Sequence, residues 1–109
     1  MIHVRKVEHE YFEALRTGRK RFELRKEEEG EEPFSAGDFL ALNEWLPQRE
    51  IPSLSPDVPP ALFEGRYTGR CLLFEILYVL RGHELQQPGT VILSLSLRPL
   101  SPDDVAAIR

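Results

Sequence analysis

Residues 65–80 read GRYTGRCLLFEILYVL and form the longest stretch of the chain that is typical of a β-strand. The second half of this stretch, from Cys71 to Leu80, is strongly apolar. Gly69 lies inside the stretch and predicts a β-bulge or the close approach of another backbone segment. We therefore expect one long strand with an irregularity near its start.

Shorter strands are predicted on both sides of this stretch, because apolar and polar residues alternate along residues 2–7, 21–26, 39–45 and 91–97. Residues 39–45 carry apolar side chains on both faces, which predicts a central, buried strand. Residues 8–17 predict a helix with one apolar face, and Gly18 supplies its C-terminal stop.

The predicted order of elements is β-α-β-β-β-β. This order favours an α+β, mainly β fold, a small closed or nearly closed barrel plugged by one or two short helices. A length of 109 residues fits a single domain, 1–109. Five prolines in residues 46–62 predict a long surface loop or insertion, and the Ser-Pro pair that opens residues 101–109 predicts a short C-terminal helix.

Composition narrows the class of protein. No apolar run approaches the roughly 20 residues that span a bilayer, and the N-terminus lacks the apolar segment of a signal peptide. The single cysteine, Cys71, cannot form an internal disulfide, so we expect a cytoplasmic protein without a membrane partner. No pair among His3, His9 and His83 has metal-ligand spacing, and no metal or cofactor is expected.

Charge is distributed unevenly along the chain. The net charge is −4, yet residues 1–26 hold eight lysines and arginines against four glutamates, a net charge of +4, and the rest of the chain carries −8. This asymmetry permits a local basic face on an acidic protein. The alternative is that the basic residues scatter over several faces after folding.

Residues 18–25, GRKRFELR, concentrate three charged groups in the pattern G-x-K-x-x-E-x-R. Lys20 follows the helix stop, and Glu23 and Arg25 are two residues apart, so they project from one strand face, opposite Phe22. Glu23 can accept a hydrogen bond from a base amino group, while Lys20 and Arg25 can meet a phosphate or a carbonyl. The alternative is a surface strand whose charges pair with one another.

Several segments accompany this motif in a fixed order, and together they cover most of residues 2–98. They are His3, Tyr11-Phe12, the motif itself with Lys26, Gly37-Asp38, Glu44-Trp45, Tyr67-Thr68-Gly69-Arg70 and Pro88-Gly89. The motif and this ordered set resemble the ASCH domains of the PUA-like superfamily, in particular a bacterial and phage branch.

The resemblance implies a PUA-like barrel with a cleft bordered by the helix, the motif strand and neighbouring loops, which binds RNA or a modified nucleoside. Trp45 is a candidate for stacking on a base, or else it seals the barrel end. Tyr67 and Arg70 flank the expected bulge, where they line the cleft or serve the bulge itself. The expected ligand-binding residues are Lys20, Glu23, Arg25, Trp45, Tyr67 and Arg70.

One branch of that family hydrolyses the acetyl amide of N4-acetylcytidine with a lysine, a threonine three residues later and a glutamate on a later strand. These positions correspond to Lys20, Glu23 and Glu75 here, so the threonine is replaced by a carboxylate that cannot serve as an alcohol nucleophile. Hydrolysis by water remains possible, with Glu23 as general base and Lys20 polarising the carbonyl.

Glu75 lies in an apolar run, residues 72–77. If buried, it needs a partner, for which Lys20 is expected; otherwise it is the outward residue of an alternating strand. Three functions therefore stand at this point: an RNA- or nucleoside-binding domain, a small amidohydrolase acting on an N-acylated nucleoside, and a protein-interaction module that uses the proline-rich loop 46–62.

Overall fold

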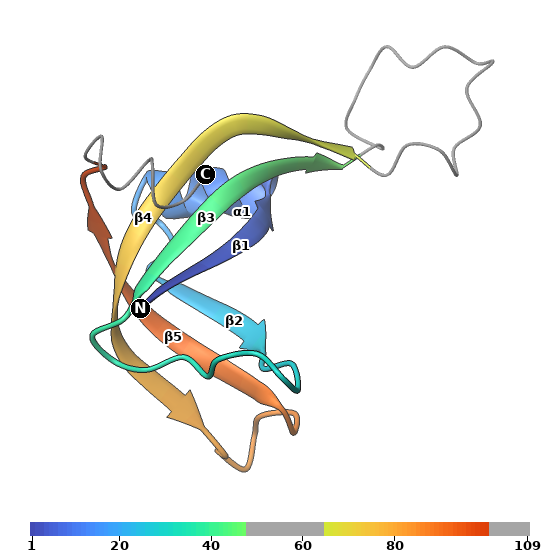
Figure 1. The fold of residues 1–109 in the computed structure, drawn as a ribbon, viewed down its shortest axis with the longest axis vertical. Helices are drawn as coiled ribbons and strands as arrows, with labels where there is room; N and C mark the ends of the chain where they lie inside the picture. Colours follow the sequence, from blue (N-terminus) through green and yellow to red (C-terminus); the bar gives the residue numbers. More distant parts are fainter. Residues whose placement is uncertain (48–64, 101–109) are drawn as a thin grey trace, which may run out of the picture.

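The computed structural model describes residues 1–47 and 65–100, which form one helix and five strands (Figure 1). The elements are β1 (Ile2–Glu8), α1 (His9–Arg16), β2 (Phe22–Lys26), β3 (Phe39–Pro47), β4 (Gly65–Arg81) and β5 (Thr90–Arg98). The predicted order and the mainly β class are confirmed. The helix expected over 101–109 and most of the proline-rich loop lie outside the described residues.

The strands form one curled sheet in the order β1-β3-β4-β5-β2. β1 pairs with β3 in parallel, and the other neighbouring pairs are antiparallel. Strands β1 and β2 are its two edges, so the described sheet is a half-barrel rather than a closed barrel. A side chain bridges the two edges: Arg25 Nη2 donates a hydrogen bond to the backbone oxygen of Lys6 at 2.9 Å.

Strand β3 is central and buried, as predicted. Leu40, Ala41 and Leu42 are fully buried between β1 and β4. The strand extends to Pro47, so the loop does not begin at residue 46 as expected. Proline is tolerated there because the pairing with β1 ends at Trp45, and a missing N–H breaks no ladder hydrogen bond on that side.

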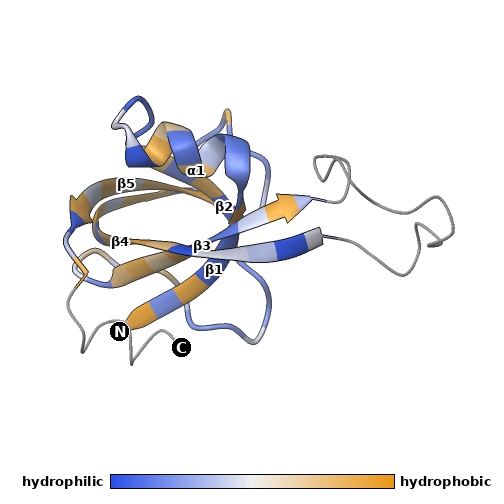
Figure 2. Cartoon of the chain, turned by 90° about the horizontal axis from the view of Figure 1, so that it is seen from above, coloured by the Kyte–Doolittle hydropathy of each residue, from blue (hydrophilic) through white to orange (hydrophobic). Residues whose placement is uncertain are grey.

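The helix α1 packs on β3 and β1, across the curled sheet (Figure 2). Its buried side chains, Phe12 and Leu15, join a core supplied mainly by β3, β4 and β5. Gly18 follows the helix with a φ of 80°, the left-handed conformation that ends a helix at glycine. Within the described ranges 1–47 and 65–100, no helix has the length and apolarity needed to cross a membrane.

The bulge predicted at Gly69 is confirmed. Asn43 pairs with Cys71 and Trp45 with Tyr67, so β4 inserts extra residues opposite one β3 position. Gly69 has a φ of 91°, which suits glycine at an irregular point of a strand. As a result, Thr68 and Arg70 both contact β3's inward-facing Glu44.

An ion pair fastens the start of the acidic loop, residues 27–32, to β4. Arg81 donates hydrogen bonds to Glu27 from Nε at 2.6 Å and from Nη2 at 2.7 Å. The backbone N–H of Phe34 donates a further hydrogen bond to Glu27. The guanidinium beside Glu27 lowers the pKa of that carboxyl below its usual value of 4.5.

We expect the protein to lose stability in acid, because protonation of Glu27 breaks its ion pair with Arg81. Because the pKa of Glu27 is lower in the folded state, its contribution is complete above about pH 4.5 and is lost as the pH falls through the folded value. Glu27→Gln should cost about 1 kcal/mol of unfolding free energy at pH 7 and much less at pH 3. Urea denaturation at both pH values measures this. The neighbouring exposed variant, Glu28→Gln, is the control, and an equal loss for both variants would contradict the account.

Candidate functional site

Strand β2 turns Glu23 and Arg25 inward and Phe22 and Leu24 outward. Glu23 is 3% exposed, whereas Phe22 and Leu24 are 50% and 59% exposed. The alternation of residues 21–26 is confirmed. The carboxylate, however, is buried rather than solvated, so the motif is not a simple surface strand.

The buried Glu23 carboxylate is held by both cations of the motif. Lys20 Nζ lies 2.6 Å from Oε1, and Arg25 Nε lies 2.8 Å from Oε2. A buried carboxylate is tolerated only when it is paired in this way. The three charged residues therefore form one unit, which we call the motif clamp.

Aromatic rings complete the surroundings of Lys20. Its ammonium lies 4.8 Å from the centre of the Tyr11 ring and 5.3 Å from that of Phe22, within the range of cation–π attraction. The other end of the clamp reaches β1 through the hydrogen bond from Arg25 to Lys6. The motif thus connects the exit of α1 with both edges of the half-barrel.

An open cleft of about 590 Å³ adjoins Lys20, between the end of α1 and strands β4 and β5. Three cations line it: Arg16, Lys20 and Arg21. Among the described residues that line it, none carries a carboxylate. The remaining lining is apolar or carries hydroxyl groups: Leu15, Thr17, Gly18, Phe74, Leu77, Ser94, Leu95, Ser96 and Leu97. We call this feature the basic cleft.

The expected ligand-binding residues do not share one surface. Lys20 lines the basic cleft, while Glu23 and Arg25 lie behind it as parts of the clamp. Trp45 and Tyr67 do come together, with ring centres 4.9 Å apart in an edge-to-face arrangement, but neither lines the basic cleft.

The expected partnership of Lys20 with Glu75 is wrong. Lys20 binds Glu23, and Glu75 instead pairs with Arg98 of β5. The physical reason is the alternation of β4: Phe74 and Ile76 point into the core, so Glu75 projects to the other side. Lys20, Glu23 and Glu75 therefore do not converge as a catalytic set.

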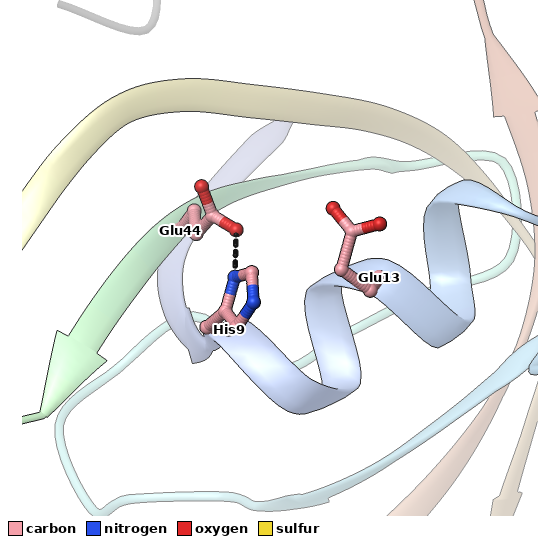
Figure 3. Close-up of side chains that lie close together, drawn as sticks. All are labelled: His9, Glu13 and Glu44. Carbon is pink, nitrogen blue, oxygen red and sulfur yellow. Dashed lines mark hydrogen bonds and ion pairs between the residues drawn. The ribbon is translucent and has the colours of Figure 1, made fainter. Parts of the chain in front are cut away.

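A second buried carboxylate, Glu44, organises a polar cluster that was not among the predicted sites. Glu44 is 2% exposed. Its Oε1 accepts a hydrogen bond from Thr68 Oγ1 at 2.5 Å, its Oε2 accepts one from Arg70 Nη2 at 3.4 Å, and His9 Nδ1 lies 2.6 Å from Oε2. Three separate segments of the chain, the start of α1, β3 and the bulge in β4, thus meet at one carboxylate. Figure 3 shows His9 of α1 and Glu44 of β3 facing each other.

Glu13 links this cluster to the basic cleft. Its carboxylate pairs with Arg70 on one side and with Arg16, a residue of the cleft, on the other. These two guanidinium groups lower the pKa of Glu13 to about 2. Glu13 is therefore ionised at neutral pH.

The signal that indicates Glu44 was present in the sequence. Glu44 lies two and four residues after Leu42 and Leu40, so it shares their inward face in a period-two strand. The predicted site residues included its neighbour Trp45 and the bulge residue Arg70, but not Glu44, the carboxylate that Arg70 contacts.

Comparison with known proteins supplies a family. No curated protein matches the chain. Residues 2–95, which span both the motif clamp and the Glu44 cluster, match the family DUF3850, described as a domain of unknown function. The chain therefore belongs to the DUF3850 family.

Proposed function

We propose that the chain binds RNA and seats one nucleotide in the basic cleft. The observation that carries this proposal is the lining of the cleft, which holds three cations and, among the described residues that line it, no carboxylate. Arg16 and Lys20 pair with Glu13 and Glu23, which lie outside the lining, and Arg21 adds a positive charge to these two pairs. Cations collected on one concave surface are the recurrent means of binding a phosphate backbone. An apolar floor with hydroxyl groups beside it suits a base and its polar edge.

The size and composition of the cleft agree with this ligand. A volume of about 590 Å³ lies within the range of small-ligand sites, roughly 300–1,000 Å³. Arg21 supplies a charge for a phosphate, and Lys20, which also pairs with Glu23, supplies a second. Leu95, on the inward face of β5, contributes apolar surface.

The negative charge of the whole chain does not oppose this function. Much of the negative charge lies in the loop of residues 27–32, which does not line the basic cleft. Exposed charges separated by more than about 10 Å are largely screened at 0.1 M salt, so local charge governs binding. The motif clamp contributes by fixing Lys20 at the rim of the cleft.

We further propose that the family lies beside the ASCH domains of the PUA-like superfamily. The curled, mainly β sheet with a single described helix, and the clamp made by the G-x-K-x-x-E-x-R residues, support this placement. A nucleoside amidohydrolase is not favoured, because Lys20 and Glu75 have different partners.

Chemical-shift mapping by NMR tests where the ligand binds. We expect a short single-stranded RNA at low salt to shift the backbone amides of residues 16–21 and 94–97. A nucleoside monophosphate should shift the same amides less at equal concentration, and an uncharged nucleoside least, because the phosphate supplies most of the attraction. Shifts confined to Trp45 and Tyr67, or the absence of shifts with RNA, would contradict the proposal.

A further inference from the structure

The Glu44 cluster brings together three side chains of the types that ligate metal ions. His9 and Glu13 are four residues apart, so they lie on one face of α1, and Glu44 faces them from β3. One ligand atom from each side chain lies within 4.8 Å of the others. Figure 3 shows the His9 ring between the two carboxylates.

We propose that His9, Glu13 and Glu44 bind a divalent first-row transition metal such as Zn²⁺. One imidazole nitrogen and two carboxylate oxygens form a mixed set that suits Zn²⁺ better than Mg²⁺ or Ca²⁺, which prefer oxygen ligands alone. This site is independent of the RNA-binding proposal, because none of the three ligands lines the basic cleft.

The distances require only a small adjustment. Zinc binds nitrogen and oxygen ligands at about 2.1 Å, which places the ligands of a tetrahedral ion about 3.4 Å apart. His9 Nδ1 and Glu44 Oε2, at 2.6 Å, already lie closer than this, and the largest separation in the set is at most 4.8 Å. Rotation of the partly exposed Glu13 and His9 side chains supplies the difference.

The surroundings of Glu44 are those of a positioned metal ligand. Its Oε1 accepts a hydrogen bond from Thr68 Oγ1, while its Oε2 faces His9 Nδ1 at 2.6 Å and lies 3.4 Å from Arg70 Nη2. A hydrogen bond such as the one from Thr68 fixes a ligating carboxylate in place, and such bonds commonly change metal affinity 10–100-fold. The His9 side chain is 47% exposed, so the site has an open side from which an ion can enter.

Arg70 is the competitor for the same charge. Its guanidinium contacts both Glu13 and Glu44, stacks on Phe12 at 4.6 Å, and is 48% exposed. A bound dication would replace one positive charge by two and release Arg70 from Glu13. We therefore expect removal of this cation to tighten metal binding. If Arg70 served only to hold the cluster together, its removal would weaken metal binding.

The test is calorimetric titration of the full chain with Zn²⁺, with Co²⁺ absorption as a spectroscopic check of coordination. We expect one ion per chain, affinity at least tenfold weaker in His9→Ala, and affinity about fivefold tighter in Arg70→Gln. His83→Ala, which removes an exposed histidine of the loop between β4 and β5, is the matched control and should stay within twofold of wild type. Circular dichroism establishes that each variant is folded.

Two results would overturn the proposal. One is the absence of 1:1 binding in both the wild type and Arg70→Gln, where the competing cation is gone. The other is binding that His9→Ala leaves unchanged or that His83→Ala removes, since the metal would then lie elsewhere on the chain.

Discussion

Replacing Glu23 with alanine is expected to lower the free energy of unfolding by about 3 kcal/mol. Removal of one partner from a buried ion pair costs about 3–5 kcal/mol, because the remaining charge is left unpaired away from water. Lys20 and Arg25 are 18% and 21% exposed, so each recovers part of its hydration, and the lower end of that range applies. Urea denaturation at pH 7 measures the change.

The matched control for this prediction is Glu75→Ala. Glu75 also lies in a strand and also pairs with an arginine, but its side chain is 28% exposed and Arg98 is 47% exposed. An exposed pair of this kind contributes about 1 kcal/mol or less. If the two variants lost equal stability, the burial of Glu23 would have no energetic consequence and the motif clamp would be no more than a surface ion pair.

The regular elements were predictable from sequence because alternation and helix-stop signals are local. Residues 2–7 and 91–97 appear as β1 and β5 within one or two residues of the expected ends. Gly69 indicated the bulge because a glycine inside a strand weakens it and often marks a bulge. The end of β3 at Pro47 was not predicted, because proline rarely occurs inside a sheet. Proline is acceptable there because the pairing of β3 with β1 ends at Trp45, before the proline.

The partners of charged side chains were not predictable in the same way. Whether Glu75 points toward Lys20 or away from it depends on the phase of β4 relative to the core, and the irregularity between Ile76 and Tyr78 changes that phase within the strand. The Glu44 cluster needs contacts between residues up to 57 positions apart in sequence, as between Glu13 and Arg70. Such contacts are set by sheet order, which the sequence pattern left open.

The second large effect is expected in RNA binding. Lys20→Gln combined with Arg21→Gln removes two charges from the basic cleft while keeping hydrogen-bond donors, so the Glu23 carboxylate still has a partner at position 20. Each cation that meets a phosphate contributes about 1 kcal/mol at low salt, so the double variant should bind single-stranded RNA about 30-fold more weakly. Its thermal unfolding shows whether the fold is kept.

Salt dependence identifies the cause of this loss. For single strands the slope of log affinity against log salt is about 0.7 per phosphate contact, so two lost contacts should flatten it by about 1.4. Lys26→Gln combined with Arg66→Gln is the matched control. It removes the same net charge from two exposed residues that do not line the basic cleft.

The most direct test of RNA binding in the basic cleft is fluorescence anisotropy. A short labelled single-stranded RNA is titrated with the wild type and with each double variant at several salt concentrations. If RNA binds in the basic cleft, Lys20→Gln/Arg21→Gln should bind the RNA more weakly than the wild type and show a flatter dependence of affinity on salt. The affinity of the control should stay within threefold of that of the wild type. Equal losses in the two double variants, or no binding by the folded wild type at low salt, would contradict it.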